Sequence, residues 1–357
     1  MTAYDVVIPT LGRPSLTACL EALAAGPGPL PEVVLLVDDR PLTDCTPLDV
    51  RVPEPLRDRV EVLAGCGRGP AAARNTGWRA AEAPWTVFLD DDVLPGPAWR
   101  ERLAADLADA APRTAGVQGR IDVPLPQDRR PTDWERSTAG LAGARWITAD
   151  MAYRREALAR VGGFDERFPR AFREDADLAL RILDAGWELT RGTRRTTHPV
   201  RPQPGRWASV RAQAGNRDDV RMTRLHGRDW RRRAGERRGR LPGHLATTAA
   251  LAAGTLAAVR GRPGAAAGWA VLWAALTAEF CATRVRPGPR TREEITTMVL
   301  SSAALPPAAA WHWLRGLLDD PRPPAWGPPP EPAPAASGAA RADHRVWEPV
   351  SRTTAAP

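Results

Sequence analysis

Short apolar runs alternate with segments of helical periodicity over the first half of the chain, and this alternation limits the fold more than any other feature. One helical segment begins near Ser15 and is expected to end at Gly26, and another begins near Trp99. Strands that alternate with helices predict an α/β fold, a mostly parallel twisted sheet with helices on both faces. The predicted strands are Tyr4–Pro9, Glu32–Asp38, Val60–Leu63 and Trp85–Leu89.

Acidic residues follow two of these strands directly. Asp38 and Asp39 close the second strand, and the triplet Asp90-Asp91-Asp92 follows the fourth. Because ligands bind beyond the carboxyl ends of strands in such sheets, both groups are expected in one crevice. Three adjacent carboxylates repel one another, and a hard divalent cation relieves that repulsion because it takes oxygen ligands. Capping the next helix, the alternative role, would need only one of the three acids.

A second acidic pair, Glu174 and Asp175, lies much further along the chain. Such a pair can supply a general base beside a bound metal. Adjacent residues of a helix do not share a face, so only one of the two acids is expected to point at a substrate. The alternative is that both acids merely occupy the first turn of a helix. Together the acidic clusters indicate a metal-assisted group-transfer enzyme.

From about residue 4 to residue 200 the chain resembles the family 2 glycosyltransferases, which have the nucleotide-sugar-binding fold called GT-A. The family's usual Gly-Ser after the acid of the second strand is replaced here by Arg40-Pro41, so the resemblance leaves the donor base open. The matching motifs, in the family's order, are Val7-Ile8-Pro9-Thr10 with Arg13, Val37-Asp38-Asp39, Ala73-Arg74-Asn75-Thr76-Gly77, Phe88-Leu89-Asp90-Asp91-Asp92, Arg154-Arg155-Glu156-Ala157-Leu158, Gly162-Gly163-Phe164-Asp165-Glu166 and Glu174-Asp175.

The resemblance implies an inverting enzyme that moves a sugar from a nucleoside-diphosphate donor to an acceptor hydroxyl with Mn²⁺ or Mg²⁺. Asp175, next to Glu174, is the implied general base, and Asp150 is expected on the acceptor side. The implied metal ligands are Asp92, Asp90 and His198. The implied donor-binding residues are Pro9, Thr10, Arg13, Asp39, Arg74, Asn75, Asp90 and Asp91.

Several of these residues have an ordinary structural alternative. Asp39 could close a turn through its side chain, and Arg74 could be a solvent-facing helix residue in a chain rich in Arg. A lone histidine such as His198 is commonly an ordinary surface or core residue. The choice between these roles depends on which side chains meet in space.

The C-terminal half differs in composition from the first 205 residues. Residues 206–240 form an Arg-rich linker or helix, in which Arg217, Arg221, Arg224, Arg228 and Arg231 recur at helical spacing and predict a basic stripe. An Ala-rich helical region follows over 241–318, and a Pro/Ala-rich tail over 319–357 is expected to be disordered. The helical region contains three charge-poor stretches close to the ~20 residues that cross a bilayer. These are Leu241–Val259, Pro263–Ala278 and Ile295–Leu314.

Contact with a membrane is predicted from these stretches and the basic stripe, which would bind anionic headgroups. Arg-rich flanks favour a catalytic domain at the cytoplasmic face of the cell membrane. A soluble helical subdomain is the alternative, because alanine dominates the stretches, Glu279 interrupts the second and Pro306-Pro307 is expected to break the third. A membrane contact would bring the site near a lipid-linked acceptor, and a polysaccharide hydroxyl is equally open.

Composition limits the remaining functions. All fifty basic residues are Arg, which indicates a coding bias, so the net charge of +8 does not predict nucleic-acid binding. The four cysteines have no metal-ligand spacing and are expected to be free thiols in a reducing cytoplasm. The sequence runs from Met1 straight into the first strand, so no signal peptide is expected. These cysteines are Cys19, Cys45, Cys66 and Cys281.

Two other functions compete with a glycosyltransferase. A sugar-nucleotide pyrophosphorylase would need a glycine-rich, basic loop after the first strand, and Thr10-Leu11-Gly12-Arg13 contains a single glycine. A catalytically inactive membrane scaffold would keep the fold, and loss of the Asp triplet or of Glu174-Asp175 would be its mark. Both acidic groups are present.

Overall fold

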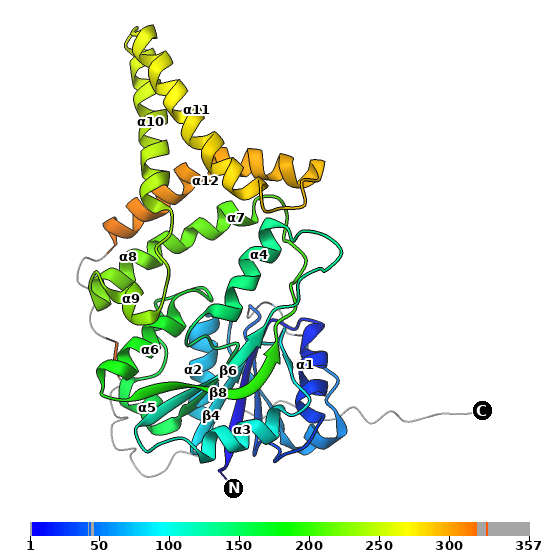
Figure 1. The fold of residues 1–357 in the computed structure, drawn as a ribbon. Helices are drawn as coiled ribbons and strands as arrows, with labels where there is room; N and C mark the ends of the chain where they lie inside the picture. The colour runs from blue at the N-terminus through cyan, green and yellow to red at the C-terminus, as the bar shows by residue number, and fades with distance from the viewer. Residues whose placement is uncertain (1, 42, 44–45, 320–325, 328–357) are drawn as a thin grey trace.

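The computed structural model describes residues 2–41, 43, 46–319 and 326–327. Its centre is an eight-stranded sheet with the strand order β3-β2-β1-β4-β7-β6-β8-β5 (Figure 1). The strands are β1 (Tyr4–Thr10), β2 (Val34–Asp38), β3 (Val60–Ala64), β4 (Trp85–Leu89), β5 (Leu94–Pro95), β6 (Thr114–Asp122), β7 (Asp150–Arg154) and β8 (Glu188–Thr197).

The sheet is mixed, with parallel pairing dominant. β3, β2, β1 and β4 run parallel to one another, as do β6 and β8. β7 pairs antiparallel with both β4 and β6, and the short β5 pairs antiparallel with the end of β8. The α/β class with a mostly parallel sheet is therefore confirmed, with β7 as the reversed strand that separates the two parallel groups.

Successive side chains of a strand point to opposite sides of the sheet, so the sheet has two apolar faces. Val6 and Ile8 of β1 face one core, and Val7 between them faces the other. The first core is covered by α1 (Ser15–Ala24) and α3 (Trp99–Ala108). The second is covered by α2 (Pro70–Ala80), α5 (Arg155–Val161) and α6 (Glu174–Asp184). Short helices lie in the connections: η1 (Glu54–Arg59), α4 (Asp133–Ala139) and η2 (Gly140–Gly143).

The C-terminal region is helical and begins close to the sheet domain. α10 and α11 form a hairpin that projects away from the sheet, and α12 crosses its base beside α7 and α8 (Figure 1). Helix α12 runs unbroken through Pro306-Pro307, contrary to the prediction. The helices are α7 (Ala208–Arg211), η3 (Ala212–Ala214), α8 (Gly215–His226), α9 (Trp230–Ala234), α10 (Leu241–Val259), α11 (Pro263–Val285) and α12 (Arg292–Leu318).

The predicted basic stripe is not a free surface, which corrects the sequence-based expectation. Arg217 pairs with Asp319 at 2.7 Å, and the Nη1 of Arg224 donates to the carbonyl oxygen of Gly316 at 2.8 Å. Arg221 donates to the carbonyl oxygen of Arg167, and Arg231 pairs with Asp219. Arg228 alone among the five stripe residues is exposed. Four of the five arginines therefore bind carboxylates or carbonyl oxygens of the protein itself.

Three sequence predictions concern the remaining surfaces. Within the described residues, α11 is the one helix long and apolar enough to cross a membrane by length and composition, and 6% of its most apolar window is buried. Cys19 is buried, Cys66 and Cys281 are partly exposed, and all three are free thiols. Cys45 lies outside the described residues. So does the predicted disordered tail, apart from Asp319, Trp326 and Gly327.

Candidate active site

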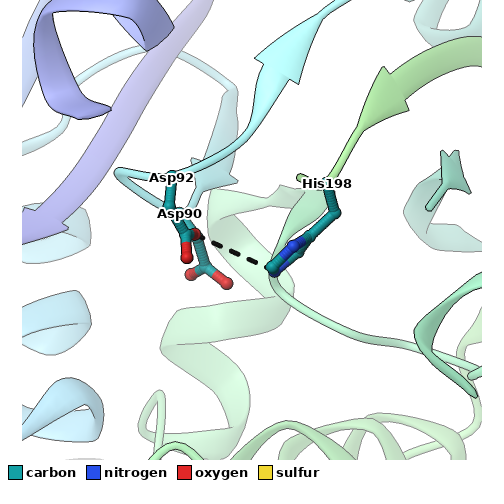
Figure 2. A group of neighbouring side chains, drawn as sticks. All are labelled: Asp90, Asp92 and His198. Atoms are coloured by element: carbon teal, nitrogen blue, oxygen red, sulfur yellow. Dashed lines mark ion pairs between the residues drawn. The ribbon is translucent and has the colours of Figure 1, made fainter. Parts of the chain in front are cut away.

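The ends of β4 and β8 bring Asp90, Asp92 and His198 together. The triplet follows the last residue of β4, and the β5–β8 pairing places Thr197 opposite Leu94, so His198 faces the triplet across the sheet edge. One ligand atom from each of the three side chains lies within 4.8 Å of the others (Figure 2). The backbone N–H of His198 donates to the carbonyl of Asp122 and fixes the residue at this edge. Strand β8 ends at Thr197, so His198 follows it directly.

The hydrogen bond of His198 favours a metal-binding tautomer. Its Nδ1 lies 3.2 Å from the carbonyl oxygen of Pro199, which can only accept a hydrogen bond, so Nδ1 carries the proton and donates. The lone pair is then on Nε2, which lies 3.8 Å from Oδ1 of Asp92. Two carboxylates and one imidazole nitrogen form a donor set that suits a divalent cation, so the side chains fit the predicted ion. Burial raises the pKa of Asp92, and the neighbouring charge of Asp90 raises it further.

Each acid of the triplet pairs with a different arginine. Asp90 accepts from Arg74 at 2.9 Å, Asp91 from Arg13 at 2.7 Å and Asp92 from Arg201 at 2.8 Å. Sequence reasoning missed Arg201. It follows His198 by three residues, and nothing in an arginine-rich chain distinguishes it before the fold is known. Its side chain is 49% exposed, so it reaches the site from the solvent side.

Arg74 joins the two acidic clusters. It lies on α2, which Pro70 begins after Gly69 at a φ of 96°, and it is buried at 2% exposure. Its Nη2 donates to Asp90, and its Nη1 donates to Glu174 at 2.9 Å. The alternative of a solvent-facing helix residue is therefore wrong. A single guanidinium group fixes the distance between the triplet and the start of α6.

Glu174 and Asp175 differ in exposure, as their adjacent helical positions require. Glu174 is buried at 2%, and its Oε2 has no hydrogen-bond partner among the described residues. Asp175 is partly exposed and is the member of the pair that solvent reaches. Loss of solvent raises the pKa of both carboxyls, and the charge of Asp175 raises that of Glu174 further. The pKa of Asp175 rises to about 6.

Two of the predicted donor-binding residues hold the loops of the site together. Asp91 is 2% exposed and accepts from Arg13 and from the hydroxyl of Thr10, which ties the end of β1 to the end of β4. Asn75 is fully buried. Its amide donates to Phe164 and Glu166, and its oxygen accepts from Trp78 and from the backbone of Phe164. The burial of Asn75 and these four bonds argue against the predicted donor contact.

Asp150, expected on the acceptor side, lies inside the molecule. It is 0% exposed at the start of β7, and it accepts hydrogen bonds from Trp99 at 2.7 Å, Arg194 at 2.8 Å and Thr196 at 2.6 Å. An aspartate with both oxygens bonded in the core cannot touch a substrate without rearrangement of β7 and β8. This position corrects the sequence-based expectation.

Asp39 closes a turn, the structural alternative considered for it, and its carboxylate also has capacity for the predicted contact with the donor base. Its two oxygens accept from the backbone N–H groups of Arg68 and Gly69, each at 3.0 Å, so it closes the turn that precedes α2. The carboxylate retains lone pairs beyond these bonds. The prediction of a contact between Asp39 and the donor base is not tested by this geometry. Pro9, the residue before the last of β1, is partly buried.

Comparison with known proteins assigns the part of the chain that carries the Asp triplet to a family. Residues 5–168 match the family model described as "Glycosyl transferase family 2". This stretch is a family 2 glycosyltransferase domain. The family predicted from the motifs is confirmed, and the α/β sheet is the fold predicted with it.

Two curated relatives resemble parts of this glycosyltransferase domain and its surroundings. A pre-mycofactocin glycosyltransferase of Mycobacterium tuberculosis is 35% identical over 136 residues, which cover 34% of this chain and 28% of that protein. A validoxylamine A glucosyltransferase of Streptomyces hygroscopicus subsp. jinggangensis is 30% identical over 221 residues and covers 52% of both chains. The chain thus spans about a quarter to a half of the length of these relatives.

Solved structures of glycosyltransferases also resemble the chain. A mannosyltransferase from Pyrobaculum calidifontis, in complex with GDP-Man and Mn²⁺, has a TM-score of 0.47 and 22% identity and covers 87% of this chain and 86% of its own. A GalNAc-T7 structure with UDP, GalNAc and Mn²⁺ has a TM-score of 0.46 and 17% identity, with 65% and 49% covered. At these scores neither structure assigns a ligand to this chain.

Proposed function

We propose that the protein is an inverting glycosyltransferase that moves a sugar from a nucleoside-diphosphate donor to an acceptor hydroxyl. The observation that carries the proposal is the convergence of Asp90, Asp92 and His198, joined through Arg74 to Glu174 and Asp175. A family 2 domain over residues 5–168 supports the same reaction class. A catalytically inactive scaffold would not need these charged side chains to converge.

Asp90, Asp92 and His198 would hold the Mn²⁺ or Mg²⁺ ion. When bound, the ion supplies Lewis-acid neutralisation of the charge that develops on the leaving nucleoside diphosphate. The donor set supports a divalent cation, because two carboxylates and one imidazole nitrogen converge within 4.8 Å of one another.

Asp175 is the general base of the proposed reaction. Its pKa of about 6 leaves the carboxylate largely ionised at neutral pH, and it is the acid of its pair that solvent reaches. It accepts the proton of the acceptor hydroxyl as that oxygen attacks the anomeric carbon. A base on the opposite side of the sugar from the leaving diphosphate gives direct displacement, which would invert the anomeric centre. Buried Glu174 orients Arg74 and does not touch the acceptor.

Arg201 and Arg13 are the donor-side cations in this scheme. Both side chains are partly exposed, and each pairs with one acid of the triplet. A planar guanidinium group matches two oxygens of a diphosphate, so Arg201 and Arg13 would bind the donor diphosphate. Asp39 stays the predicted contact for the donor base.

The α10–α11 hairpin is the proposed membrane contact. Its α11 has the length and hydropathy of a spanning helix, and its most apolar window is 6% buried. Exposed apolar side chains along it include Val259 at 80% and Val271 at 70%. Contact between this hairpin and a bilayer would place the site at the cytoplasmic face of the membrane, next to a lipid-linked hydroxyl. A polysaccharide hydroxyl is the acceptor expected if the hairpin binds no lipid.

A thermal-shift panel tests the proposed donor and metal. UDP, GDP, ADP, CDP and dTDP are each added with and without Mn²⁺ to the wild-type protein, to Asp92→Asn and to Asp58→Asn, an exposed acid on η1. A nucleotide at 100 times its Kd adds about 2.7 kcal/mol, which raises the Tm by roughly 5–10 °C. We expect one nucleotide to act only with Mn²⁺, and Asp92→Asn alone to abolish the shift. No shift with any nucleotide would favour the inactive scaffold.

A further inference from the structure

The residue before the acidic pair has an unfavourable backbone conformation. Arg173 precedes Glu174 at the start of α6 with φ at 78° and ψ at −15°, in the left-handed region. It is one of four non-glycine residues with positive φ among those the structure describes. A side chain at such a position persists where the surrounding contacts hold it. This turn sets the direction in which the acidic pair leaves the loop and enters the helix.

The contacts that hold Arg173 come from the C-terminal region. Its Nε donates to Asp219 at 2.8 Å, and its Nη1 pairs with Glu236 at 2.8 Å. The guanidinium group lies 4.8 Å from the ring centroid of Trp230 and 4.3 Å from that of Phe172. The side chain is 12% exposed. Three of these four partners lie beyond residue 205, and all four lie outside the stretch that matches the family model.

Neighbouring contacts between the same two regions reinforce this arrangement. His226 of α8 lies 2.8 Å from Asp177, which is in the first turn of α6. Arg170, just before the turn, pairs with Asp218. Beneath them a separate apolar core joins the loop before α6, the helix itself, α8 and α9. Its members are Phe168, Ala176, Leu180, Met222, Trp230 and Ala234.

We propose that Arg173 is a positioning residue for the acidic pair, and that its partners Asp219, Trp230 and Glu236 are thereby part of the active-site architecture. The inference rests on the proposed function, in which Asp175 is the base. Arg74 holds Glu174 from the sheet side, and Arg173 holds the same turn from the helical side. The Asp175 carboxylate is fixed relative to Asp90 and Asp92 because both sides of its turn are held.

Three variants separate the contacts of Arg173 from its backbone strain. Arg173→Gly accepts the positive φ but loses every side-chain contact, Arg173→Lys keeps the charge but loses the planar fork, and Glu236→Gln removes one partner without altering the turn. The control is Arg232→Ala on α9, whose side chain is 83% exposed and pairs with Asp229. The Tm of each variant shows that it is folded before its kinetics are measured.

The kinetic experiment measures nucleoside-diphosphate release at saturating donor and Mn²⁺. We expect Arg173→Gly to lower kcat at least tenfold, Arg173→Lys to lower it less, and donor affinity to change less than twofold in both. Arg232→Ala should match the wild type. If Arg173→Gly keeps kcat within threefold of the wild type, or loses donor affinity and kcat together, the inference is wrong.

The pH profile adds a readout that general destabilisation would not produce. The charged groups around Asp175 are Glu174, Arg74, Arg173 and Glu236, with the phenol of Tyr153 nearby. The charge of Arg173 lowers the pKa of Asp175, and that of Glu236 raises it. The acidic limb of kcat should therefore move to higher pH in Arg173→Gly and to lower pH in Glu236→Gln. Shifts in the same direction would contradict the proposed geometry.

Amide hydrogen exchange separates this inference from the proposed function. Peptides that cover residues 170–180 should exchange faster in Arg173→Gly than in the wild type and in Arg232→Ala. If the wild type releases no nucleoside diphosphate from any donor, the proposed function fails, and faster exchange would still show that Arg173 holds the turn. Unchanged exchange in Arg173→Gly would overturn the positioning role regardless of activity.

Discussion

Replacement of Arg74 by methionine should strongly destabilise the fold, because Arg74 is the buried partner of two acids. Its side chain and that of Glu174 are each 3% exposed and lie 2.9 Å apart. Removing one partner of a buried ion pair typically costs about 3–5 kcal/mol, since the remaining charge has no partner and little water. At roughly 2–4 °C per kcal/mol for a domain of this size, the Tm should fall by about 6–20 °C.

The pH dependence of this loss follows from Glu174. Burial already raises the pKa of Glu174 in the folded protein, and loss of Arg74 removes an attractive charge and raises it further. A raised carboxyl pKa means that the folded state takes up a proton more readily than the unfolded state. The destabilisation is therefore largest at alkaline pH and becomes smaller as the pH falls through the folded pKa of Glu174. Burial raises the pKa of Glu174 to about 8, so scanning calorimetry from pH 10 to pH 7 should show the Tm difference from wild type shrinking.

Two further variants make this prediction refutable. Arg74→Met combined with Glu174→Gln should recover part of the lost Tm, because the unpaired charge is gone. Arg79→Met, on the same helix, removes an arginine that is 38% exposed and lies 3.4 Å from Glu166, so it should cost no more than about 1 kcal/mol. If Arg74→Met costs as little as Arg79→Met, or if the double variant recovers nothing, Arg74 does not bridge the acidic clusters as described.

Three other outcomes follow from the site and the hairpin. Asp175→Asn should lower kcat by about 10²–10⁴-fold while the Mn²⁺-dependent thermal shift persists, and loss of both would make Asp175 a binding residue. In the wild type, kcat should fall as the pH drops through about 6, where Asp175 takes up a proton, and a flat profile from pH 5 to pH 8 would exclude it as the base. Val271→Asp should reduce co-sedimentation with anionic lipid vesicles, with Val62→Asp, the same change at an exposed valine of β3, as a control that leaves it unchanged; equal binding by Val271→Asp would exclude the hairpin as the lipid contact.

The sequence predicts the strand ends well because their chemistry is local. A run of β-branched residues followed by Asp90 or Asp39 specifies both the strand and the place where a carboxylate emerges. The direction of each side chain beyond that point depends on tertiary partners. Asn75 and Asp150 belong to segments that line the site, yet each turns into the core, where Trp78 and Arg194 supply the hydrogen bonds.

The C-terminal region was harder to predict because its interactions are long-range. Helical spacing of arginines indicates one charged face and contains no information about acids such as Asp319 that pair with it. The Pro306-Pro307 pair removes two helical N–H donors, but buried Leu305, Pro306 and Ala309 pack within the helical region and keep α12 continuous. Tertiary packing thus overrides a local helix-breaking signal.

The small core beneath α6 has a consequence for how the protein can be divided. A chain cut after residue 205 would retain every motif of the glycosyltransferase domain, but it would expose Phe168 and Leu180 and leave Asp177 without His226. Arg173, the residue with positive φ at the start of α6, would then lose its contacts with Asp219, Trp230 and Glu236. The stretch that matches the family model ends at residue 168, whereas the segment that folds as one cooperative unit extends further along the chain. A minimal catalytic fragment must therefore extend at least to Glu236.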